Sequence, residues 1–314
     1  MSIEAVVKTD NLSKTFAGAV QAVSALDLAV PRGAVYGLIG RNGAGKTTAI
    51  RMLMGLLRPT GGRAEVLGAD LWRARRSHRE RVSYVSQEQQ VHAWMTLEEL
   101  CCYCSLLYSE WDQTYAEKLA GRFGLALGRQ VGLMSGGERR KAAILLALAA
   151  RPEVLIMDEP AAGLDPVARR ELVDALVDSL SGERGQTVLF STHIISDLER
   201  VADYVGIMDR GRMVSSSPLE DLQSSTRRIQ IVFQGDQVPE GFRLPGAVRF
   251  ETSGPVYTAV VRLTTESDLD GLGERLNARV NTFPLGLEDI FIELFGPDEF
   301  TTEHTESTEG RSHE

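Results

Sequence analysis

The chain has 314 residues, of which 43% are hydrophobic and 25% charged, a composition typical of a globular protein with one large or two modest domains. Its net charge of −9 argues against a general nucleic-acid-binding protein, because such a protein needs a basic face to neutralise phosphates. The longest apolar run, 142–150, is far shorter than the ~20 residues that span a bilayer, and the residues around Glu4 lack the apolar stretch of a signal peptide. We therefore expect a cytoplasmic protein.

The beginning of the chain predicts short strands followed by a strand, a loop and a helix. Residues 1–33 contain apolar segments with partial alternation, which indicates strands and turns. An apolar run of strand length occupies 34–39, and residues 46–57 have the spacing of a helix with one apolar face. A further strand is expected at 81–86.

The segment 88–150 predicts a mostly helical insert, with helices at 96–107, 115–123 and 135–150. Three cysteines fall in the first of these helices: Cys101, Cys102 and Cys104. A structural metal site normally has four ligands, so we interpret this odd group as reduced thiols on a helix.

The next segment alternates buried strands with helices. Residues 154–157 form a continuous apolar strand, as expected for a parallel sheet that is covered on both faces, and further strands are expected at 187–191, also buried, and at 205–208. Helices at 167–180 and 194–201 separate them. The pattern indicates an α/β fold with a mostly parallel sheet.

The pattern changes near residue 215. A short helix is expected beyond it, followed by two strands at 228–234 and 256–263 and two helices at 268–277 and 287–295. We therefore divide the chain into a first domain at 1–215 and a small α+β accessory domain at 216–300, whose role the sequence leaves open between regulation and dimer support. The polar tail 301–314 is expected to be disordered.

A phosphate-binding motif lies between the strand at 34–39 and the helix that follows. The sequence Gly40-Arg41-Asn42-Gly43-Ala44-Gly45-Lys46-Thr47 fits G-x-x-x-x-G-K-[ST], and Thr48 follows it. Glycines let backbone N–H groups surround phosphate oxygens, and the helix N-terminus adds partial positive charge. Lys46 would reach the β- and γ-phosphates and Thr47 would bind Mg²⁺. The alternative is a glycine-rich strand–helix turn that binds nothing.

Two carboxylates stand at the end of the buried strand 154–157. In open α/β sheets, ligands bind at the carboxyl ends of strands. Asp158 would hold Mg²⁺, directly or through water, and Glu159 would orient and deprotonate an attacking water. The alternative is a pair of loop acids that cap a turn.

A second anion-binding element opens the helix at 135–150. Ser135 and Glu138 form an S-x-x-E capping box, which is a sufficient reason for both residues. Capping does not explain Gly136 and Gly137, which cost helix stability but suit close approach of an anion. Because one nucleotide does not need two such elements from one chain, a dimer with ATP at its interface is expected.

These motifs together resemble the nucleotide-binding subunit of ATP-binding-cassette (ABC) transporters. The resemblance covers residues 5–215 and rests on a series of motifs in the family's order. They are the phosphate loop, Gln87, Ser135-Gly136-Gly137, Asp158-Glu159, Gly163-Leu164-Asp165 and Ser191-Thr192-His193. The fold implied is a P-loop NTPase core with a mostly parallel sheet, an antiparallel β subdomain and a helical insert.

The resemblance also implies roles for four residues that are uninformative alone. Phe16 stands where the family stacks an aromatic ring on adenine, although local evidence favours a core position. Gln87 would contact Mg²⁺ and the attacking water, and His193 would contact the γ-phosphate. Asp165 would cross the dimer interface.

The chain departs from the family's pattern at the second anion-binding element. Met134 and Glu138 stand where Leu and Gln are usual. Met for Leu conserves volume, whereas Glu138 adds a negative charge near bound triphosphate. We expect slightly weaker closure on ATP than Gln would give.

The resemblance further implies the partners. Residues 286–295 and 160–166 resemble drug- and lipid-exporter ATPases, whose insert, here around Trp94 to Trp111, meets the membrane subunit. We therefore expect a homodimeric ATPase that requires ATP and Mg²⁺, powers a permease on a separate chain, lies on the inner face of the cell membrane and binds no nucleic acid. The alternatives are a non-transport cassette ATPase that acts on ribosomes or DNA, and a P-loop kinase.

Overall fold

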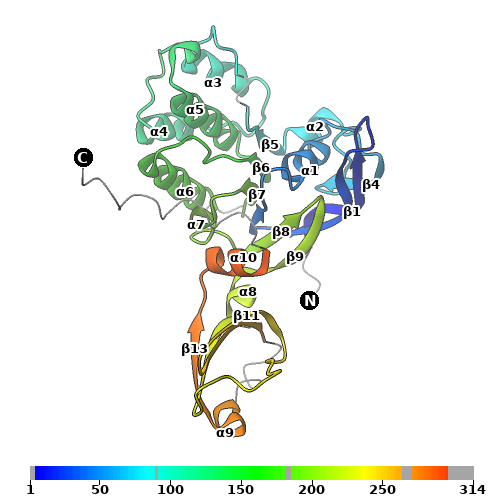
Figure 1. Cartoon of the computed structure of the whole chain (residues 1–314). Coiled ribbons are helices and arrows are strands. Elements are labelled where there is room, and N and C mark those ends of the chain that lie inside the picture. Colours follow the sequence, from blue (N-terminus) through cyan, green and yellow to red (C-terminus); the bar gives the residue numbers. More distant parts are fainter. Residues whose placement is uncertain (1–3, 89–90, 181–184, 264–270, 296–314) are drawn as a thin grey trace, which may run out of the picture. The chain divides into compact units, whose positions relative to one another are not determined.

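The computed structural model describes residues 4–88, 91–180, 185–263 and 271–295. The chain divides into two compact units, residues 1–219 and 220–314 (Figure 1). Each unit has a hydrophobic core of its own.

The first unit is built on a six-stranded sheet in the order β5-β6-β7-β3-β8-β9. The strands are β3 (Val35–Ile39), β5 (Val82–Val85), β6 (Val154–Asp158), β7 (Thr187–Thr192), β8 (Tyr204–Asp209) and β9 (Arg212–Pro218). The first five in the sheet order are parallel, and β9 is antiparallel to β8. Every residue of β3, β6 and β7 is buried, which explains why these strands are mostly apolar and lack the alternation of a half-buried strand.

A three-stranded antiparallel sheet packs near this parallel sheet. It consists of β1 (Ala5–Thr15), β2 (Gln21–Pro31) and β4 (Gly61–Val66), in the order β2-β1-β4. Side chains from both sheets and from α1 (Lys46–Leu53) form one core, to which Leu12, Leu38 and Ile50 contribute. The phosphate loop between β3 and α1 is therefore fixed by a continuous apolar core.

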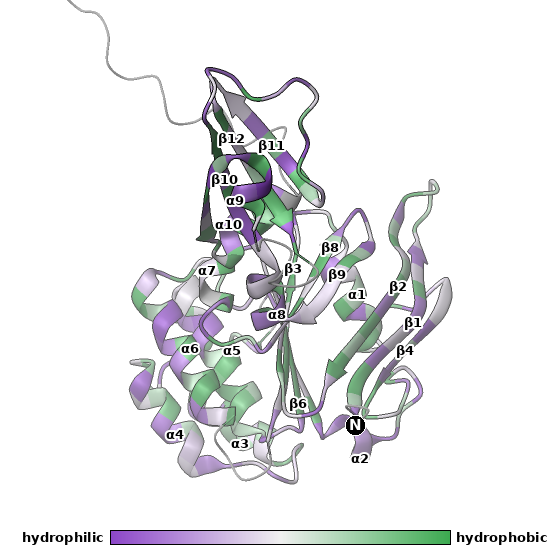
Figure 2. Cartoon of the chain, turned by 90° about the horizontal axis from the view of Figure 1, so that it is seen from below, coloured by the Kyte–Doolittle hydropathy of each residue, from purple (hydrophilic) through white to green (hydrophobic). Residues whose placement is uncertain are grey.

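The insert is helical, with α3 (Leu97–Ser105), α4 (Gln113–Arg122) and α5 (Gly136–Ala149). Polar residues stop fraying at the helix starts, since Thr96 forms a capping box with Glu99 and Asp112 accepts from the backbone N–H of Tyr115. The remaining helices of the unit are α2 (Arg76–Arg79), the 3₁₀ helix at Val131–Leu133, α6 (Pro166–Leu180) and α7 (Ile195–Leu198). Figure 2 shows hydrophobic residues on the central strands and hydrophilic stretches along α4 and α6.

The second unit contains a four-stranded antiparallel sheet in the order β11-β12-β10-β13. Its elements are α8 (Leu219–Ser225), β10 (Thr226–Phe233), β11 (Ala247–Ser253), β12 (Val256–Arg262), α9 (Leu272–Leu276), β13 (Ala278–Pro284) and α10 (Leu287–Phe295). Alternate residues such as Ile229, Ile231 and Tyr257 are fully buried in its core.

The α/β fold class expected from the sequence, with a P-loop core and a mostly parallel sheet, is confirmed. The predicted end of the first helix is wrong. The helix stops at Leu53, because Gly55 takes φ +66 and a Cβ there would lie 2.6 Å from the backbone nitrogen of Trp72. Leu57 packs against the core from the following turn, which explains its apolar character.

Four strands lack the apolar runs that would have predicted them: β4, β9, β11 and β13. Their residues are mostly exposed or half-buried, so pairing with a neighbour rather than burial makes them strands. Residues 268–270 of the predicted helix at 268–277, and the tail 301–314, lie outside the described residues.

Candidate active site

The phosphate loop requires glycine at two positions for steric reasons. A Cβ on Gly40 would lie 2.4 Å from the carbonyl oxygen of Met208, and one on Gly45 would lie 2.4 Å from that of Ala22. Gly45 also has φ +100, in the left-handed region, and it precedes α1 without a side-chain cap. The first N–H groups of α1 are therefore available to an anion.

Lys46 is held inside this loop and is only 5% exposed. Its Nζ donates to the carbonyl oxygen of Gly40 at 2.6 Å and lies 3.4 Å from Oε1 of Glu159. A buried ammonium needs such partners, because an unpaired charge is expensive to desolvate. The ammonium and the carboxylate predicted from separate motifs thus lie together.

Asp158 ends β6 and is fully buried. Its Oδ1 accepts from Oγ1 of Thr47 at 3.1 Å and from Oγ of Ser191 at 2.7 Å. Its Oδ2 has no hydrogen-bond partner. A buried carboxylate oxygen without a donor is costly, so this atom fits a cation that approaches from the phosphate loop.

The oxygens of Thr47 and Asp158 fit Mg²⁺, which binds one or two protein oxygens and completes its shell with water and substrate phosphates. The described parts of the chain hold no group of three or more His, Cys, Asp or Glu that would bind a metal through protein side chains alone.

Glu159 follows Asp158 in a strained conformation, with φ +51. Its backbone N–H donates to Oγ of Ser191 at 3.0 Å, and its Oε2 lies 2.7 Å from Nδ1 of His193. The side chain of Glu159 is only 7% exposed, whereas that of His193 is 48% exposed. Glu159 therefore lies between Lys46 and His193 with its carboxylate bound by both.

The sequence reasoning missed two residues of this site as contributors. Ser191 orients both Asp158 and Glu159, and its position just before Thr192-His193 was a usable signal. Arg140 donates to the backbone carbonyl oxygens of Gln87 and Glu159, the former at 2.8 Å. Nothing in the sequence distinguishes Arg140 from the many other arginines.

The second anion-binding element is capped as expected. Ser135 Oγ accepts from the N–H of Glu138 at 3.2 Å, and Glu138 Oε2 accepts from the N–H of Ser135 at 2.7 Å. The other oxygen of Glu138 pairs with Nη1 of Arg129 at 2.7 Å. The hydrogen bonds from Ser135, with Arg129, hold the pKa of Glu138 below its usual value.

Among the residues that the structure describes, none gives a steric reason for the two glycines of this element. A Cβ on Gly136 would meet nothing within 4 Å, and one on Gly137 would make only an ordinary contact of 3.7 Å with Leu164. Their cost to helix α5 is therefore not offset by packing within one chain.

Phe16 and Asp165 lie on the surface. Phe16 is 43% exposed, with Nζ of Lys14 5.4 Å from its ring centroid. The core position that the local sequence favours for Phe16 is therefore wrong. Oδ1 of Asp165 accepts from the N–H groups of Val167 and Ala168 at 2.9 Å each, which caps α6. These hydrogen bonds, the one from Ala168 first, lower the pKa of Asp165.

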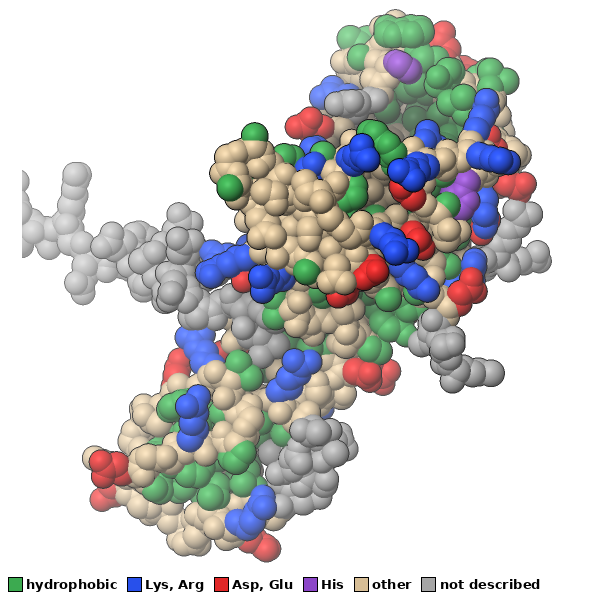
Figure 3. Space-filling view, turned by 90° about the vertical axis from the view of Figure 1, so that its right-hand side faces the viewer, with side chains coloured by type: hydrophobic (Ala, Val, Ile, Leu, Met, Phe, Trp, Pro, Cys, Tyr) green, Lys and Arg blue, Asp and Glu red, His purple; other side chains and the backbone are tan. Residues whose placement is uncertain are grey.

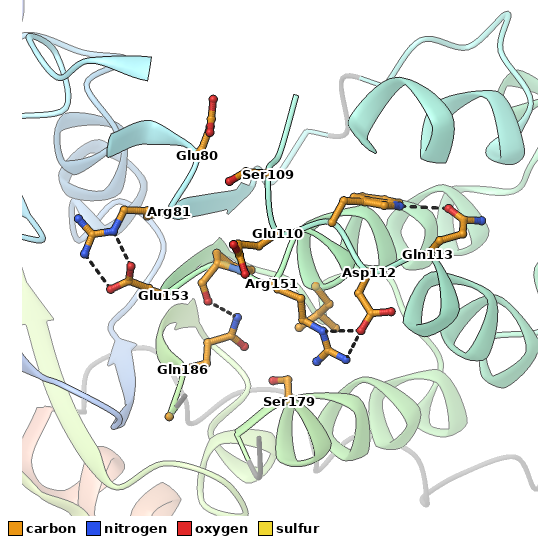
Figure 4. Close-up of a pocket in the computed structure, with 14 residues that line it drawn as sticks. Glu80, Arg81, Ser109, Glu110, Asp112, Gln113, Arg151, Glu153, Ser179 and Gln186 are labelled. Carbon is orange, nitrogen blue, oxygen red and sulfur yellow. Dashed lines mark hydrogen bonds and ion pairs between the residues drawn. The ribbon is translucent and has the colours of Figure 1, made fainter. Parts of the chain in front are cut away.

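A cavity of about 690 Å³ lies elsewhere, at the starts of β5, β6 and β7 (Figure 4). Both of its arginines are engaged, Arg81 by Glu153 at 2.8 Å and Arg151 by Asp112 at 2.8 Å. In parallel sheets the opposite edge, at the carboxyl ends, binds ligands. We therefore place the nucleotide at the phosphate loop and not in this cavity.

Comparisons with known proteins agree with this geometry. The family model described as ABC transporter matches residues 23–162. The daunorubicin/doxorubicin resistance ATP-binding protein DrrA of Streptomyces peucetius is 33% identical over 96% of this chain and 97% of its own length. This chain belongs to the ABC transporter family. It is an ATP-binding, ATP-hydrolysing subunit of such a transporter.

Other ABC subunits show the same likeness. The bacitracin transport ATP-binding protein BcrA of Bacillus licheniformis is 33% identical over 71% of this chain and 73% of its own length. A solved ATP-binding subunit of an ABC transporter is 28% identical, covers 70% of this ABC subunit and 92% of that chain, and has a TM-score of 0.63. Within the described residues of this ABC subunit, no helix has the length and apolarity to cross a membrane.

Proposed function

We propose that ATP and Mg²⁺ bind at the phosphate loop and that Glu159 activates the water that attacks the γ-phosphate. The proposal rests on one observation: Lys46, Thr47, Asp158 and Glu159 converge, and Asp158 presents a buried oxygen without a partner. Mg²⁺ held by Thr47 and Asp158 would neutralise phosphate charge. Backbone N–H groups from Gly40 to Thr48, those of Asn42, Gly43, Ala44 and Gly45 among them, would surround the phosphates.

The remaining side chains would act around this centre. Lys46 would exchange its contact with Glu159 for the β- and γ-phosphates, which frees the carboxylate for water. Glu159 would take the water's proton while His193, already 2.7 Å from that carboxylate, contacts the γ-phosphate. Gln87 would contact Mg²⁺ and the water, and Phe16, half-exposed, is available to stack on adenine.

We further propose that two chains close on two ATP molecules. Ser135, Gly136 and Gly137 of one chain would bind the γ-phosphate held by the partner, with Glu138 capping the turn and Asp165 crossing the interface. The empty space around Gly136 among the described residues supports this proposal, because the close approach of a second molecule's phosphate would explain a glycine there.

An exposed apolar patch supports a contact with the membrane subunit. Trp94 is 71% exposed, Tyr103 45% and Leu106 75%. They belong to the α3 end of the insert, where Figure 3 shows hydrophobic side chains together. Exposed apolar patches of this kind mark protein interaction sites. We propose that a permease on a separate chain covers this patch and holds the subunit at the inner face of the membrane.

We propose export as the direction of transport. The relatives include proteins of bacitracin transport, daunorubicin resistance and Nod factor export.

We also propose that the domains of the chain are 1–215 and 216–300, followed by the tail 301–314. We propose in addition that the protein has no nucleic-acid partner. Co-purification with ribosomes or DNA, rather than with an integral membrane protein from detergent-solubilised membranes, would contradict this assignment.

The decisive experiment is Glu159→Gln, which keeps the size of the side chain and removes its basicity. We expect ATP turnover to fall by at least about a hundredfold, and ATP to hold the variant as a dimer in light scattering. The matched control is Glu171→Gln, which removes a half-buried acid that pairs with Lys141 and is not part of the proposed active site, and this variant should keep the turnover of the unaltered chain. A Glu159→Gln chain that stays monomeric with ATP contradicts the proposal.

A further inference from the structure

Arg140 lies in the first turns of α5, five residues after the Ser135 cap, and its guanidinium reaches out of the insert. One terminal nitrogen, Nη2, donates to the carbonyl oxygen of Gln87 at 2.8 Å, and the other, Nη1, donates to the carbonyl oxygen of Glu159. A single planar fork therefore joins α5 to two other segments, which lie 19 and 53 residues from Arg140 in the chain.

The two acceptors are significant because of the residues to which they belong. Gln87 and Glu159 are the two residues that we propose to contact the attacking water. Glu159 also has the strained φ of +51, a conformation that persists only when surrounding contacts hold it. Arg140 supplies one of these contacts, from the helix that carries the second anion-binding element.

Arg140 is partly buried, so its charged guanidinium loses part of its hydration, which costs free energy. Burial lowers the pKa of the guanidinium, and the nearby carboxylates Glu159 and Asp158 oppose that effect. The hydrogen bonds from Arg140 to Gln87 and Glu159 end on neutral carbonyl oxygens, so the fork fixes backbone rather than forming a simple ion pair.

Other contacts already tie the insert to the core. Lys141 of α5 pairs with Glu171 of α6 at 2.7 Å, and Arg122 of α4 pairs with Asp178 of α6 at 2.8 Å. Neither pair includes a residue of the proposed active site. Attachment of the insert therefore does not require Arg140, which leaves positioning as its distinct contribution.

We propose that Arg140 is a positioning residue, which couples the placement of helix α5 to the backbones of Gln87 and Glu159. When ATP or a partner shifts the Ser135-Gly136-Gly137 turn, the fork carries the shift to the segment that orients the attacking water. This inference rests on the proposed roles of Glu159 and Gln87.

The test compares three variants in the full-length dimer-forming chain, with ATP turnover and thermal unfolding as readouts. Arg140→Gln removes the fork and should lower kcat about tenfold while KM for ATP changes less than about twofold, because the phosphate-binding groups are untouched. Arg140→Lys keeps the charge but offers no planar fork, so it should recover only part of kcat. Arg122→Gln removes another arginine that ties the insert to the core and should leave kcat within about twofold.

The outcomes separate this inference from the proposed function. If Glu159→Gln abolishes turnover while Arg140→Gln retains or raises kcat, the coupling role is wrong and the proposed active site stands. If Glu159→Gln itself retains turnover, the proposed active site fails. A loss of thermal stability and of kcat in Arg140→Gln that Arg122→Gln reproduces in full would also overturn the inference, since both arginines would then act only by holding the insert.

Discussion

Asp158 and Glu159 are neighbours in the chain, yet the structure gives them different tasks. Asp158 is the last residue of a strand, and while its Oδ1 accepts from Thr47 of the phosphate loop, its Oδ2 has no hydrogen-bond partner and would be neutralised by a cation. Glu159 leaves the strand at a positive φ, so its carboxylate turns toward Lys46 and His193. Ser191 makes the difference possible because it bonds the side chain of one and the N–H of the other.

Glu138 provides a prediction at the same scale. The sequence suggests that its negative charge opposes bound triphosphate, and the structure places Arg129 against that charge at 2.7 Å. Arg129→Gln should expose the charge and raise KM for ATP about threefold, with a smaller effect on kcat. Glu138→Gln should tighten ATP binding slightly.

The double variant Arg129→Gln with Glu138→Gln is the control for this prediction. It should restore the KM of the unaltered chain, because no unpaired charge is left. A steady-state titration of ATP measures all four forms. Equal KM values for Arg129→Gln and the unaltered chain would show that Glu138 does not act on the triphosphate.

Among the elements, helix α5 carries the clearest conflict between stability and function. Gly136 is an inferior helix residue, and among the described residues nothing lies within 4 Å of the place of its missing Cβ. Gly136→Ala should leave the melting temperature unchanged or raise it, with a gain of up to about 1 kcal/mol in the free energy of unfolding. ATP-driven dimerisation should weaken at the same time, because in the proposed dimer the methyl group would face the partner's phosphate.

Gly121→Ala is the matched control for this helix prediction. Gly121 lies in α4, and a Cβ there would also meet nothing within 4 Å. It should stabilise the chain in the same way without changing dimerisation. Thermal unfolding and light scattering with ATP check both variants, and equal effects of the two on dimerisation would remove the reason for assigning Gly136 to the interface.

At the scale of the whole molecule, each active site of the proposed dimer contains residues of both chains. Lys46→Ala would remove the ammonium that binds the β- and γ-phosphates, and it would do so only in the phosphate loop of its own chain. Gly136→Asp places a carboxylate at a helix N-terminus, which suits the helix dipole but repels the partner's triphosphate. Each variant alone should be nearly inactive.

A mixture of the two variants in equal amounts should regain activity. Half of the dimers then contain one chain of each kind, and one of their two sites is intact, so turnover should return to about a quarter of the unaltered value if the sites act independently. The measurement is ATP turnover against the mixing ratio. Absence of recovery, in a mixture shown to contain mixed dimers, would contradict the shared site.

The sequence by itself determined the fold class and the family, because motifs carried by consecutive residues are local. The phosphate loop, the Asp158-Glu159 pair and the Ser135 capping box depend on neighbours within a few positions, and uninterrupted apolar runs identify strands covered on both faces. The roles that we assign to the site residues extend this local information and stay predictions.

Only the tertiary structure decided which atoms meet across the chain. The free oxygen of Asp158, the Arg129 partner of Glu138 and the Arg140 fork depend on contacts between segments that no periodicity relates. The exposed strands β4 and β11 likewise exist through pairing rather than burial, so their sequences lack an apolar signal. Hydrogen bonds between distant segments leave no pattern in the sequence. For this physical reason the sequence determined the fold class and the family, and only the tertiary structure decided these contacts.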